Sequence, residues 1–303
     1  MSFSNTSISD MQVAVFGRGF PSYARENIAT LFSKFSTLNV NVWIYGPLYE
    51  FLQKETGLRP QKAGLFNGPD DLPVDTDFLF SLGGDGTFLD TVNLVKNSGI
   101  PVLGVNIGRL GFLSYVNLEN LEESIDSVFS GRFDIEERLL LQVETLEDGV
   151  ARDQGLALND VRLYKNSGSL ITIHVKVNDE FLSSYWADGL LLSTPTGSTA
   201  YNLSVGGPIV VPESRSLILS PIAPHNLTVR PLVLPDSAVL ELSVDTRDEC
   251  YQLAMDSRSV DLDLDCAVRV SKAKQSLRMI RIENISFYST LRNKLMWGAD
   301  KRN

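Results

Sequence analysis

Cysteine and histidine are scarce in this chain. Its 303 residues include two of each, namely Cys250, Cys266, His174 and His225. Two cysteines are too few for a disulfide-based scaffold, and none of the four residues has the spacing of a metal-binding motif. We therefore expect neither a disulfide framework nor a structural zinc site, and the sequence offers no candidate metal ligand.

Long hydrophobic runs are also absent. No uninterrupted apolar stretch approaches the roughly 20 residues that cross a bilayer. The amino-terminal stretch, MSFSNTSISDMQVAVFGRGF, lacks the basic start, apolar core and cleavage site of a secretory signal. The sequence thus predicts a cytoplasmic protein without a membrane partner.

Basic residues are outnumbered. The chain has 27 Lys and Arg against 37 Asp and Glu, a formal net charge of −10. A broad surface for nucleic acid or an anionic membrane needs a basic face, so neither is expected as a partner. Small anionic ligands remain possible, because backbone N–H groups, a bound cation and a few arginines suffice for them.

The first part of the chain alternates strand-like and helix-like patterns. Residues 12–16 (QVAVF) predict a strand that runs into Gly17-Arg18-Gly19, and residues 23–35 predict an amphipathic helix. Further strands are expected at 39–45, 77–82 and 101–105, and further helices at 47–55, 87–97 and 117–130. This alternation predicts a Rossmann-like α/β domain, a mostly parallel sheet with helices on both faces.

After about residue 134 the pattern changes to short apolar or alternating runs separated by turn residues. Such runs occur at 138–146, 156–164, 170–177, 189–193, 226–233, 237–244, 250–255, 266–271 and 278–283. Regularly spaced strands with almost no helical pattern predict an antiparallel all-β domain. The expected domains are 1–133 and 134–283, followed by a carboxyl-terminal segment at 284–303.

The stretch SLGGDGTFLD at 81–90 contains an unusual charge, Asp85, within a cluster of glycines. It follows a predicted strand, at the edge where open α/β sheets bind ligands. It matches neither common phosphate-binding loop. The glycines allow close approach, the N–H groups that open the next helix favour an anion, and Asp85 beside them suits a general base. The alternative is that Asp85 only caps the helix or shapes the turn.

Two downstream segments add polar groups. Asn159-Asp160 interrupts the apolar strand pattern LALNDVRLY, and the pair offers donors and acceptors for ribose or adenine, although a strand-end turn is an equal alternative. Residues 188–204, DGLLLSTPTGSTAYNLS, predict a strand that leads into a long hydroxyl-rich loop with one aromatic residue, Tyr201. Such a loop can donate to a sugar or phosphate while its aromatic ring covers a base.

Together these segments resemble the NAD kinase family. The resemblance is carried by GGDGT at 83–87, GVNIGRLGF at 104–112, LND at 158–160, DGLLLSTPTGSTAYNLSVGGPI at 188–209 and PHNLTVRPLVLP at 224–235. It implies an α/β amino-terminal domain, an all-β carboxyl-terminal domain and an active site between them. It also implies transfer of the γ-phosphoryl group of ATP to the 2′-hydroxyl of the adenosine ribose of NAD, with a divalent metal, expected to be Mg²⁺ held mainly by the phosphates and water.

The resemblance also implies roles for individual residues. Asp85 becomes the proton acceptor, and the nucleotide site includes Gly83, Gly84, Gly86, Thr87 and Arg109. Dinucleotide contacts fall to Asn159, Asp160, Asp188, Thr199, Ala200, Tyr201, Asn202, Leu203 and Ser204. His225 lies in a matching segment without an assigned role, and residues 284–303 are expected to pack back on the first domain.

The sequence departs from the family pattern at Asp256-Ser257-Arg258. Many relatives have an Asp-Gly pair there, so Ser257 either alters the turn or leaves Arg258 to pair with a phosphate, which makes Arg258 a further candidate ligand contact.

Other functions share part of this pattern. A lipid kinase of the diacylglycerol type shares GGDGT but should have a basic or amphipathic membrane-facing surface. A dinucleotide-binding sensor without catalysis is the alternative from another class. The exposed edges of a large β domain favour a homo-oligomer, a dimer or tetramer.

Overall fold

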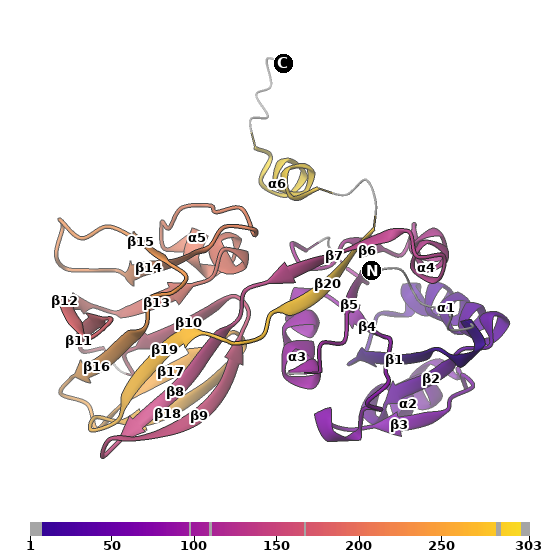
Figure 1. Cartoon of the computed structure of the whole chain (residues 1–303), viewed down its shortest axis with the longest axis horizontal. Coiled ribbons are helices and arrows are strands. Elements are labelled where there is room, and N and C mark those ends of the chain that lie inside the picture. The colour runs from indigo at the N-terminus through magenta and orange to yellow at the C-terminus, as the bar shows by residue number, and fades with distance from the viewer. Residues whose placement is uncertain (1–7, 97, 109–110, 167, 283–285, 298–303) are drawn as a thin grey trace. The chain divides into compact units, whose positions relative to one another are not determined.

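The computed structural model describes residues 8–96, 98–108, 111–166, 168–282 and 286–297. The chain divides into two compact units (Figure 1): Met1–Glu137 with Leu277–Asn303, and Arg138–Ser276. The expected boundaries at 133 and 283 differ from these, because β7 and β20 join the first sheet. A short apolar run indicates a strand but not the sheet in which that strand pairs.

The first unit is built on one sheet, with the strand order β3-β2-β1-β4-β5-β20-β7 and β6 paired to β5. The strands are β1 (Gln12–Gly17), β2 (Asn41–Tyr45), β3 (Gly64–Phe66), β4 (Phe78–Gly83), β5 (Val102–Asn106), β6 (Val116–Asn117), β7 (Phe133–Arg138) and β20 (Leu277–Ile282). Along this order, neighbouring strands from β3 to β20 pair in parallel. The predicted parallel α/β sheet is confirmed.

Helices cover both faces of this sheet, with α1 and α4 together on one face and α3 on the other (Figure 1). The helices of this unit are α1 (Arg25–Leu38), α2 (Gly46–Phe51), α3 (Asp85–Val95), α4 (Leu121–Phe129) and α6 (Phe287–Leu295), and its short helical turns are η1 (Ile8–Asp10), η2 (Ser22–Ala24), η3 (Leu52–Thr56) and η4 (Pro69–Asp71).

The sequence of β4 is almost continuously apolar because the strand is covered on both faces. Phe78 and Phe80 join the core formed with α1 and α4, and the ring of Phe80 lies 5.2 Å from that of Phe35. Leu79 points to the opposite face and is fully buried. A strand covered on both faces has no polar side, and its end is held rigidly. The Gly83-Gly84 loop therefore starts from a fixed position.

The second unit consists of two six-stranded sheets in which every pairing is antiparallel. One has the order β15-β14-β13-β10-β17-β18 and the other β12-β11-β16-β19-β8-β9. Their strands are β8 (Leu141–Glu147), β9 (Val150–Ala157), β10 (Asp160–Tyr164), β11 (Ile171–Val177), β12 (Glu180–Ala187), β13 (Gly189–Ser193), β14 (Ser216–Ile222), β15 (Leu232–Pro235), β16 (Leu240–Asp245), β17 (Cys250–Met255), β18 (Arg258–Asp263) and β19 (Ala267–Lys272).

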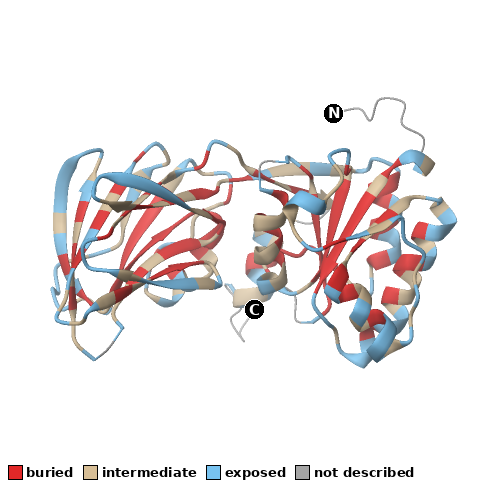
Figure 2. Ribbon diagram, turned by 90° about the horizontal axis from the view of Figure 1, so that it is seen from below, coloured by how far each residue is buried: buried red, intermediate tan, exposed pale blue. Residues whose placement is uncertain are grey.

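A single apolar core fills the space between these two sheets (Figure 2). Val161 and Leu163 of β10 contribute from one sheet, and Ile171 and Ile173 of β11 contribute from the other. In each strand, the residue between the two core residues points to the opposite face of the sheet, as the alternation of a β-strand requires. The predicted all-β domain is confirmed, and its helical parts are η5 (Thr196–Thr199) and α5 (Tyr201–Ser204).

Candidate functional site

The GGDGT segment forms the turn from β4 into α3. The helix begins at Asp85, two residues earlier than the sequence pattern indicates, and its N-cap is Gly84, without a side-chain cap. Asp85 is therefore in the first turn of the helix, but its carboxylate does not bond to the N–H groups of that turn. Helix capping does not account for the charge at this position.

The Asp85 carboxylate instead accepts two hydrogen bonds from a neighbouring loop. The backbone N–H of Phe112 donates to Oδ2 at 2.8 Å, and that of Leu113 donates to Oδ1 at 3.2 Å. The loop approaches so closely that a Cβ at Gly111 would lie 1.7 Å from Asp85 Oδ1. Only glycine at position 111 leaves room for this carboxylate, which is half-buried.

The loop that meets Asp85 is itself held to the sheet. It follows β5, where the N–H of Ile107 donates to the Gly83 carbonyl at 3.3 Å. Asn106 Oδ1 accepts from the N–H of Gly108 at 2.7 Å, and the Tyr23 hydroxyl donates to the Ile107 carbonyl at 2.7 Å. The carboxyl ends of β4 and β5 thus carry the two segments that position Asp85.

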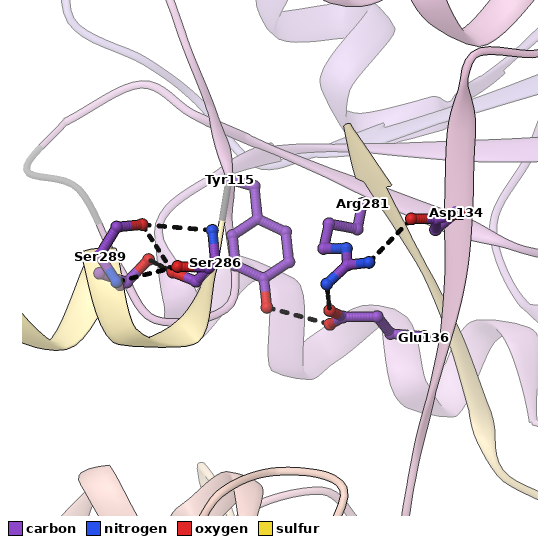
Figure 3. Close-up of polar contacts among 7 residues, drawn as sticks. Tyr115, Asp134, Glu136, Arg281, Ser286 and Ser289 are labelled. Atoms are coloured by element: carbon purple, nitrogen blue, oxygen red, sulfur yellow. Dashed lines mark hydrogen bonds and ion pairs between the residues drawn. The ribbon is translucent and has the colours of Figure 1, made fainter. Parts of the chain in front are cut away.

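Farther along the same loop, Tyr115 belongs to a polar network with β7 and β20 (Figure 3). Its hydroxyl donates to Glu136 at 3.1 Å, and Glu136 also pairs with Arg281 at 3.2 Å. Arg281 pairs with Asp134 at 2.7 Å as well, and this hydrogen bond raises the pKa of the guanidinium. The network fixes the end of the loop that holds Asp85.

Figure 3 also shows the start of α6, where Ser286 and Ser289 form a reciprocal capping box. The side chain of each serine bonds to the backbone of the other, which satisfies N–H groups that a helix end leaves free. Lys294 of this helix lies 5.9 Å from the ring centroid of Phe112, beside the Asp85 loop.

The glycines of GGDGT differ in what surrounds them. A Cβ at Gly83 would lie 2.3 Å from the hydroxyl oxygen of Thr87, so folding itself demands glycine there. Gly84 and Gly86 are exposed, have no positive φ and would meet nothing within 4 Å. Among the residues that the structure describes, neither turn geometry nor packing in the first unit explains them. Open space over a helix start is what an approaching ligand requires.

In the second unit, the LND segment is organised by Asp256. The Asp256 carboxylate accepts from the N–H groups of Leu158 at 2.8 Å, Asn159 at 2.8 Å and Asp160 at 3.2 Å. Burial raises its pKa, while these three hydrogen bonds and the nearby Arg258 oppose the rise. A turn residue from β17–β18 therefore fixes the backbone at the start of β10.

The TPTGST loop lies against the same LND segment. The Thr194 hydroxyl donates to the Leu158 carbonyl at 2.6 Å, and the Thr194 N–H donates to the Asn159 carbonyl at 2.9 Å. A Cβ at Gly197 would lie 2.0 Å from the Asn159 carbonyl oxygen, so position 197 must be glycine. The LND and TPTGST motifs, which are far apart in the sequence, are thus hydrogen-bonded and packed against each other in the structure.

Asn202 secures the far end of this loop and is fully buried. Its amide donates to the Pro208 carbonyl at 3.1 Å, and its oxygen accepts from the Ser220 hydroxyl at 2.7 Å. A Cβ at Gly207 would lie 2.0 Å from that oxygen. The Asn202 side chain is thus bonded within the protein, whereas the neighbouring Tyr201 and Ser204 are exposed. Thr199, Ala200 and Leu203, also on this loop, are half-buried.

Asp160 is only 3% exposed, and its Oδ1 pairs with Arg162 Nε at 2.9 Å. Burial raises the pKa of Asp160 to about 6, the Arg162 guanidinium opposes the rise, and the Asp256 carboxylate adds to it. The guanidinium carbon of Arg162 also lies 5.2 Å from the centre of the Tyr201 ring. Arg162 therefore links the LND and TPTGSTAY segments through an ion pair and a cation–π contact, in addition to the backbone hydrogen bonds between them.

Asp188 lies apart from this cluster. In the antiparallel pairing of β10 with β13, Asp160 faces Ser193 and Tyr164 faces Gly189, so Asp188 is at the opposite end of the pair. Its carboxylate pairs with Lys165 at 2.6 Å. Within this unit the structure does not bring Asp188 to Asp160 or Tyr201.

The remaining candidates have other positions. Arg258 donates to the Leu156 carbonyl at 2.8 Å, so in this structure it supports β9. Of the two turn residues, Asp256 has the positive φ, at 51°, and Ser257 does not, so the turn needs no glycine at 257. The ring of His225 is tilted by 44° relative to that of Trp186, with the ring centroids 5.4 Å apart. Arg109 lies outside the described residues.

Two family models match the chain. The ATP-NAD kinase N-terminal domain matches residues 67–133, and the ATP-NAD kinase C-terminal domain matches residues 158–282. An NAD kinase of Flavobacterium psychrophilum is 42% identical over 299 residues, covering 97% of this chain and 100% of that protein. The chain belongs to the NAD kinase family. It is accordingly a phosphotransferase of the NAD kinase type, as the sequence motifs predict.

Other relatives agree. An NAD kinase of Porphyromonas gingivalis strain W83 is 42% identical over 292 residues, covering 96% of this chain and 99% of that protein. The structure of yeast NADH kinase complexed with NADH has 26% identity and a TM-score of 0.86, covering 96% of this chain and 89% of that one. An Archaeoglobus fulgidus NAD kinase in complex with ATP, at 23% identity, has a TM-score of 0.71 over 94% of this chain and 99% of that one, and shows the shared fold.

Two further structural findings concern membranes and metals. In the described ranges no helix combines the length and apolar character needed to cross a membrane. Among the same residues, no group of three or more His, Cys, Asp or Glu side chains is arranged to hold a metal ion.

Sequence reasoning left three site residues without a role. Gly111 stands within GVNIGRLGF, but nothing in the sequence shows that Asp85 fills the space beside it. The sequence indicates a turn at Asp256 but does not show that its carboxylate accepts hydrogen bonds from three backbone N–H groups. Arg162 could have been found, because a residue two positions after Asp160 lies on the same face of an extended strand.

We predict that Gly111→Ala disables the enzyme without unfolding it. The new methyl group would displace the Asp85 carboxylate and break its bonds to Phe112 and Leu113, so turnover of NAD to NADP should fall about 10²-fold or more. Gly68→Ala is the matched control, since a Cβ there meets nothing within 4 Å. The midpoint of thermal unfolding should be similar for both variants. A Gly111→Ala variant with the turnover of the wild type would contradict the prediction.

Proposed function

We propose that the chain transfers the γ-phosphoryl group of ATP to the 2′-hydroxyl of the adenosine ribose of NAD or NADH, with Asp85 as the proton acceptor. The observation that carries this assignment is the Asp85 carboxylate, which does not cap its own helix and is oriented by two backbone N–H groups. A ribose hydroxyl is a poor nucleophile, and a positioned base typically contributes about 10²–10⁴-fold by accepting its proton.

The geometry of Asp85 suits this role. Each carboxylate oxygen takes one backbone hydrogen bond and retains further capacity to accept a proton. The negative charge would disfavour direct contact with phosphate, but the incoming hydroxyl is neutral. The carboxylate therefore acts on the sugar, while neighbouring groups interact with the phosphates.

The exposed glycines supply the phosphate side of the proposed site. Gly84 and Gly86 leave the opening turn of α3 uncovered, and the N–H groups there favour an anion. We propose that Mg–ATP is the donor substrate, with Mg²⁺ held mainly by its phosphates and water. Gly83 and Thr87 pack against each other and maintain the turn. Arg109 stays a candidate contact of this site.

We assign NAD binding to the second unit. Asn159, Asp160 and Tyr201 offer an amide, a carboxylate and an exposed ring for ribose and adenine. Because Arg162 holds Oδ1 of Asp160, the ligand would take the other carboxylate oxygen. Thr199, Ala200, Leu203 and Ser204 complete the proposed contact loop. Asn202 supports that loop from within, while Asp188 and Arg258 stay candidates for contacts outside the Asp160–Tyr201 cluster.

We further propose a cytoplasmic homo-oligomer, a dimer or tetramer. Strand β12 is an edge strand of its sheet and carries Phe181 and Trp186, which are 60% and 56% exposed. An edge strand with exposed aromatic residues favours association with another chain. Size-exclusion chromatography with light scattering should give two or four chains for the wild type and a smaller assembly for Phe181→Lys/Trp186→Lys. A monomeric wild type would refute the proposal.

Replacing the proposed base tests the catalytic assignment. Asp85→Asn keeps the side-chain shape but cannot accept the proton, so kcat should fall at least ~10²-fold while NAD affinity stays within a few-fold. The readout is NADP or NADPH formed from Mg–ATP and NAD or NADH. Asp126→Asn, which removes a surface carboxylate paired with Lys34 at 2.7 Å, should keep normal turnover. Normal turnover in Asp85→Asn would remove the assignment.

The raised pKa of Asp160 predicts a pH dependence of NAD binding. Its pKa of about 6 means that the carboxylate becomes protonated as the pH falls through 6 and loses the negative charge that strengthens its hydrogen bond from a ribose hydroxyl. The KM for NAD should therefore be constant above pH 7 and about tenfold higher at pH 5. Asp160→Asn should raise this KM at pH 7 and remove its dependence on pH. A wild-type KM that is flat between pH 5 and pH 7 would exclude the Asp160 contact.

A further inference from the structure

Arg162 connects three segments of the second unit. Its Nε lies 2.9 Å from Asp160 Oδ1, and its Nη2 donates to the Asp256 carbonyl at 2.6 Å. Its guanidinium carbon lies 5.2 Å from the centre of the Tyr201 ring. One side chain thus touches the LND segment, the β17–β18 turn and the start of α5.

The backbone of β10 explains how one residue reaches all three. Asp160 and Arg162 are two positions apart on an extended strand, so they share the face opposite the core residues Val161 and Leu163. The guanidinium is planar and presents donors in several fixed directions. One edge can therefore pair with the Asp160 carboxylate and donate to the Asp256 carbonyl while the guanidinium carbon stays within 5.2 Å of the Tyr201 ring centre.

The ring of Tyr201 retains a surface for a ligand. The residue is 40% exposed despite its contact with Arg162, and the Arg162 side chain itself is only 24% exposed. A cation over an aromatic ring restrains the ring and interacts favourably with its π electrons. A flat base can then stack on a ring whose orientation is already set, which lowers the entropy lost on binding.

We propose that Arg162 is a positioning residue for the dinucleotide. Its guanidinium holds the Asp160 carboxylate and the Tyr201 ring in the arrangement that receives the adenosine portion of NAD. Arg162 acts through these two side chains and does not touch the reacting atoms. The inference rests on the proposed function, in which Asp160 and Tyr201 contact NAD.

Electrostatics support the same conclusion. The charged groups around Asp160 are Arg162, which lowers its pKa, and Asp256, which raises it; Asp256 in turn faces Arg258. Without Arg162, burial and the Asp256 carboxylate would act unopposed. The pKa of Asp160 would rise above about 6, and a larger fraction of the enzyme would be protonated at neutral pH.

Arg162→Met tests this role, because it retains a long apolar side chain but removes the charge and the donors. At pH 7 the KM for NAD should rise about tenfold, and the midpoint of its pH dependence should move up by about one unit. At pH 8.5 and saturating NAD, kcat and the KM for ATP should stay within about twofold. Arg162→Lys keeps the charge, so its midpoint should remain near that of the wild type while the KM for NAD rises only a few-fold.

Two matched variants make the outcomes distinguishable. Arg152→Met removes an exposed arginine of the same unit, paired with Glu147 at 3.0 Å, and should leave all constants unchanged. Asp160→Asn reports on the proposed NAD contact itself. If it leaves the pH dependence of the KM unchanged, the proposed contact fails and the inference fails with it.

If Asp160→Asn abolishes that pH dependence but Arg162→Met does not move its midpoint, only the positioning role of Arg162 is overturned. An equal loss of kcat and thermal stability in Arg162→Met and Arg162→Lys, with an unshifted midpoint, would also overturn it in favour of a purely structural role.

Discussion

The two hydrogen bonds from Phe112 and Leu113 to the Asp85 carboxylate are the contact on which the first unit's site depends. They require glycine at 111, a loop fixed to the end of β5, and a helix that begins at Asp85. The parallel sheet meets these requirements, because the carboxyl ends of β4 and β5 lie side by side. A charge that has no role in capping its helix is thereby held in a defined orientation.

In the second unit, side chains also hold the backbone of the proposed site in place, here by satisfying its N–H and C=O groups. The dinucleotide site proposed there needs a polar surface at the edge of an apolar sandwich, where unsatisfied backbone groups are costly. The Asp256 carboxylate accepts hydrogen bonds from three backbone N–H groups at the start of β10. Thr194 donates to the carbonyls of Leu158 and Asn159 in the same segment. The backbone is satisfied internally, so the side chains of Asn159 and Tyr201 remain available to a ligand.

Much of this could be predicted from the sequence. Buried strands such as 77–82 and alternating strands such as 170–177 have patterns that follow directly from how many faces are covered. The pattern at 278–283 predicts a strand, but that pattern is the same whether the strand pairs with β5 or with a strand of the sandwich. The choice depends on contacts between segments far apart in the chain, which periodicity does not encode.

The site was predictable in its residue types but not in its contacts. The motifs indicate Asp85, Asp160 and Tyr201. They do not show that Gly111 makes room for Asp85, or that Arg162 contacts both Asp160 and Tyr201. These contacts depend on close approach in space. The same limit applies to Asp188, whose motif is contiguous with TPTGST although a full strand separates them in the structure.

Gly86 illustrates a conflict between stability and activity. It lies within the first turn of α3, has open space around it and needs no positive φ. By helix propensity alone, alanine there would stabilise the fold by up to about 1 kcal/mol. An engineer who raised the melting temperature from propensity rules would choose this position early, and would do so at the expense of the phosphate side of the proposed site. Thermostabilised variants of this enzyme should therefore be sought outside the turn at 83–87.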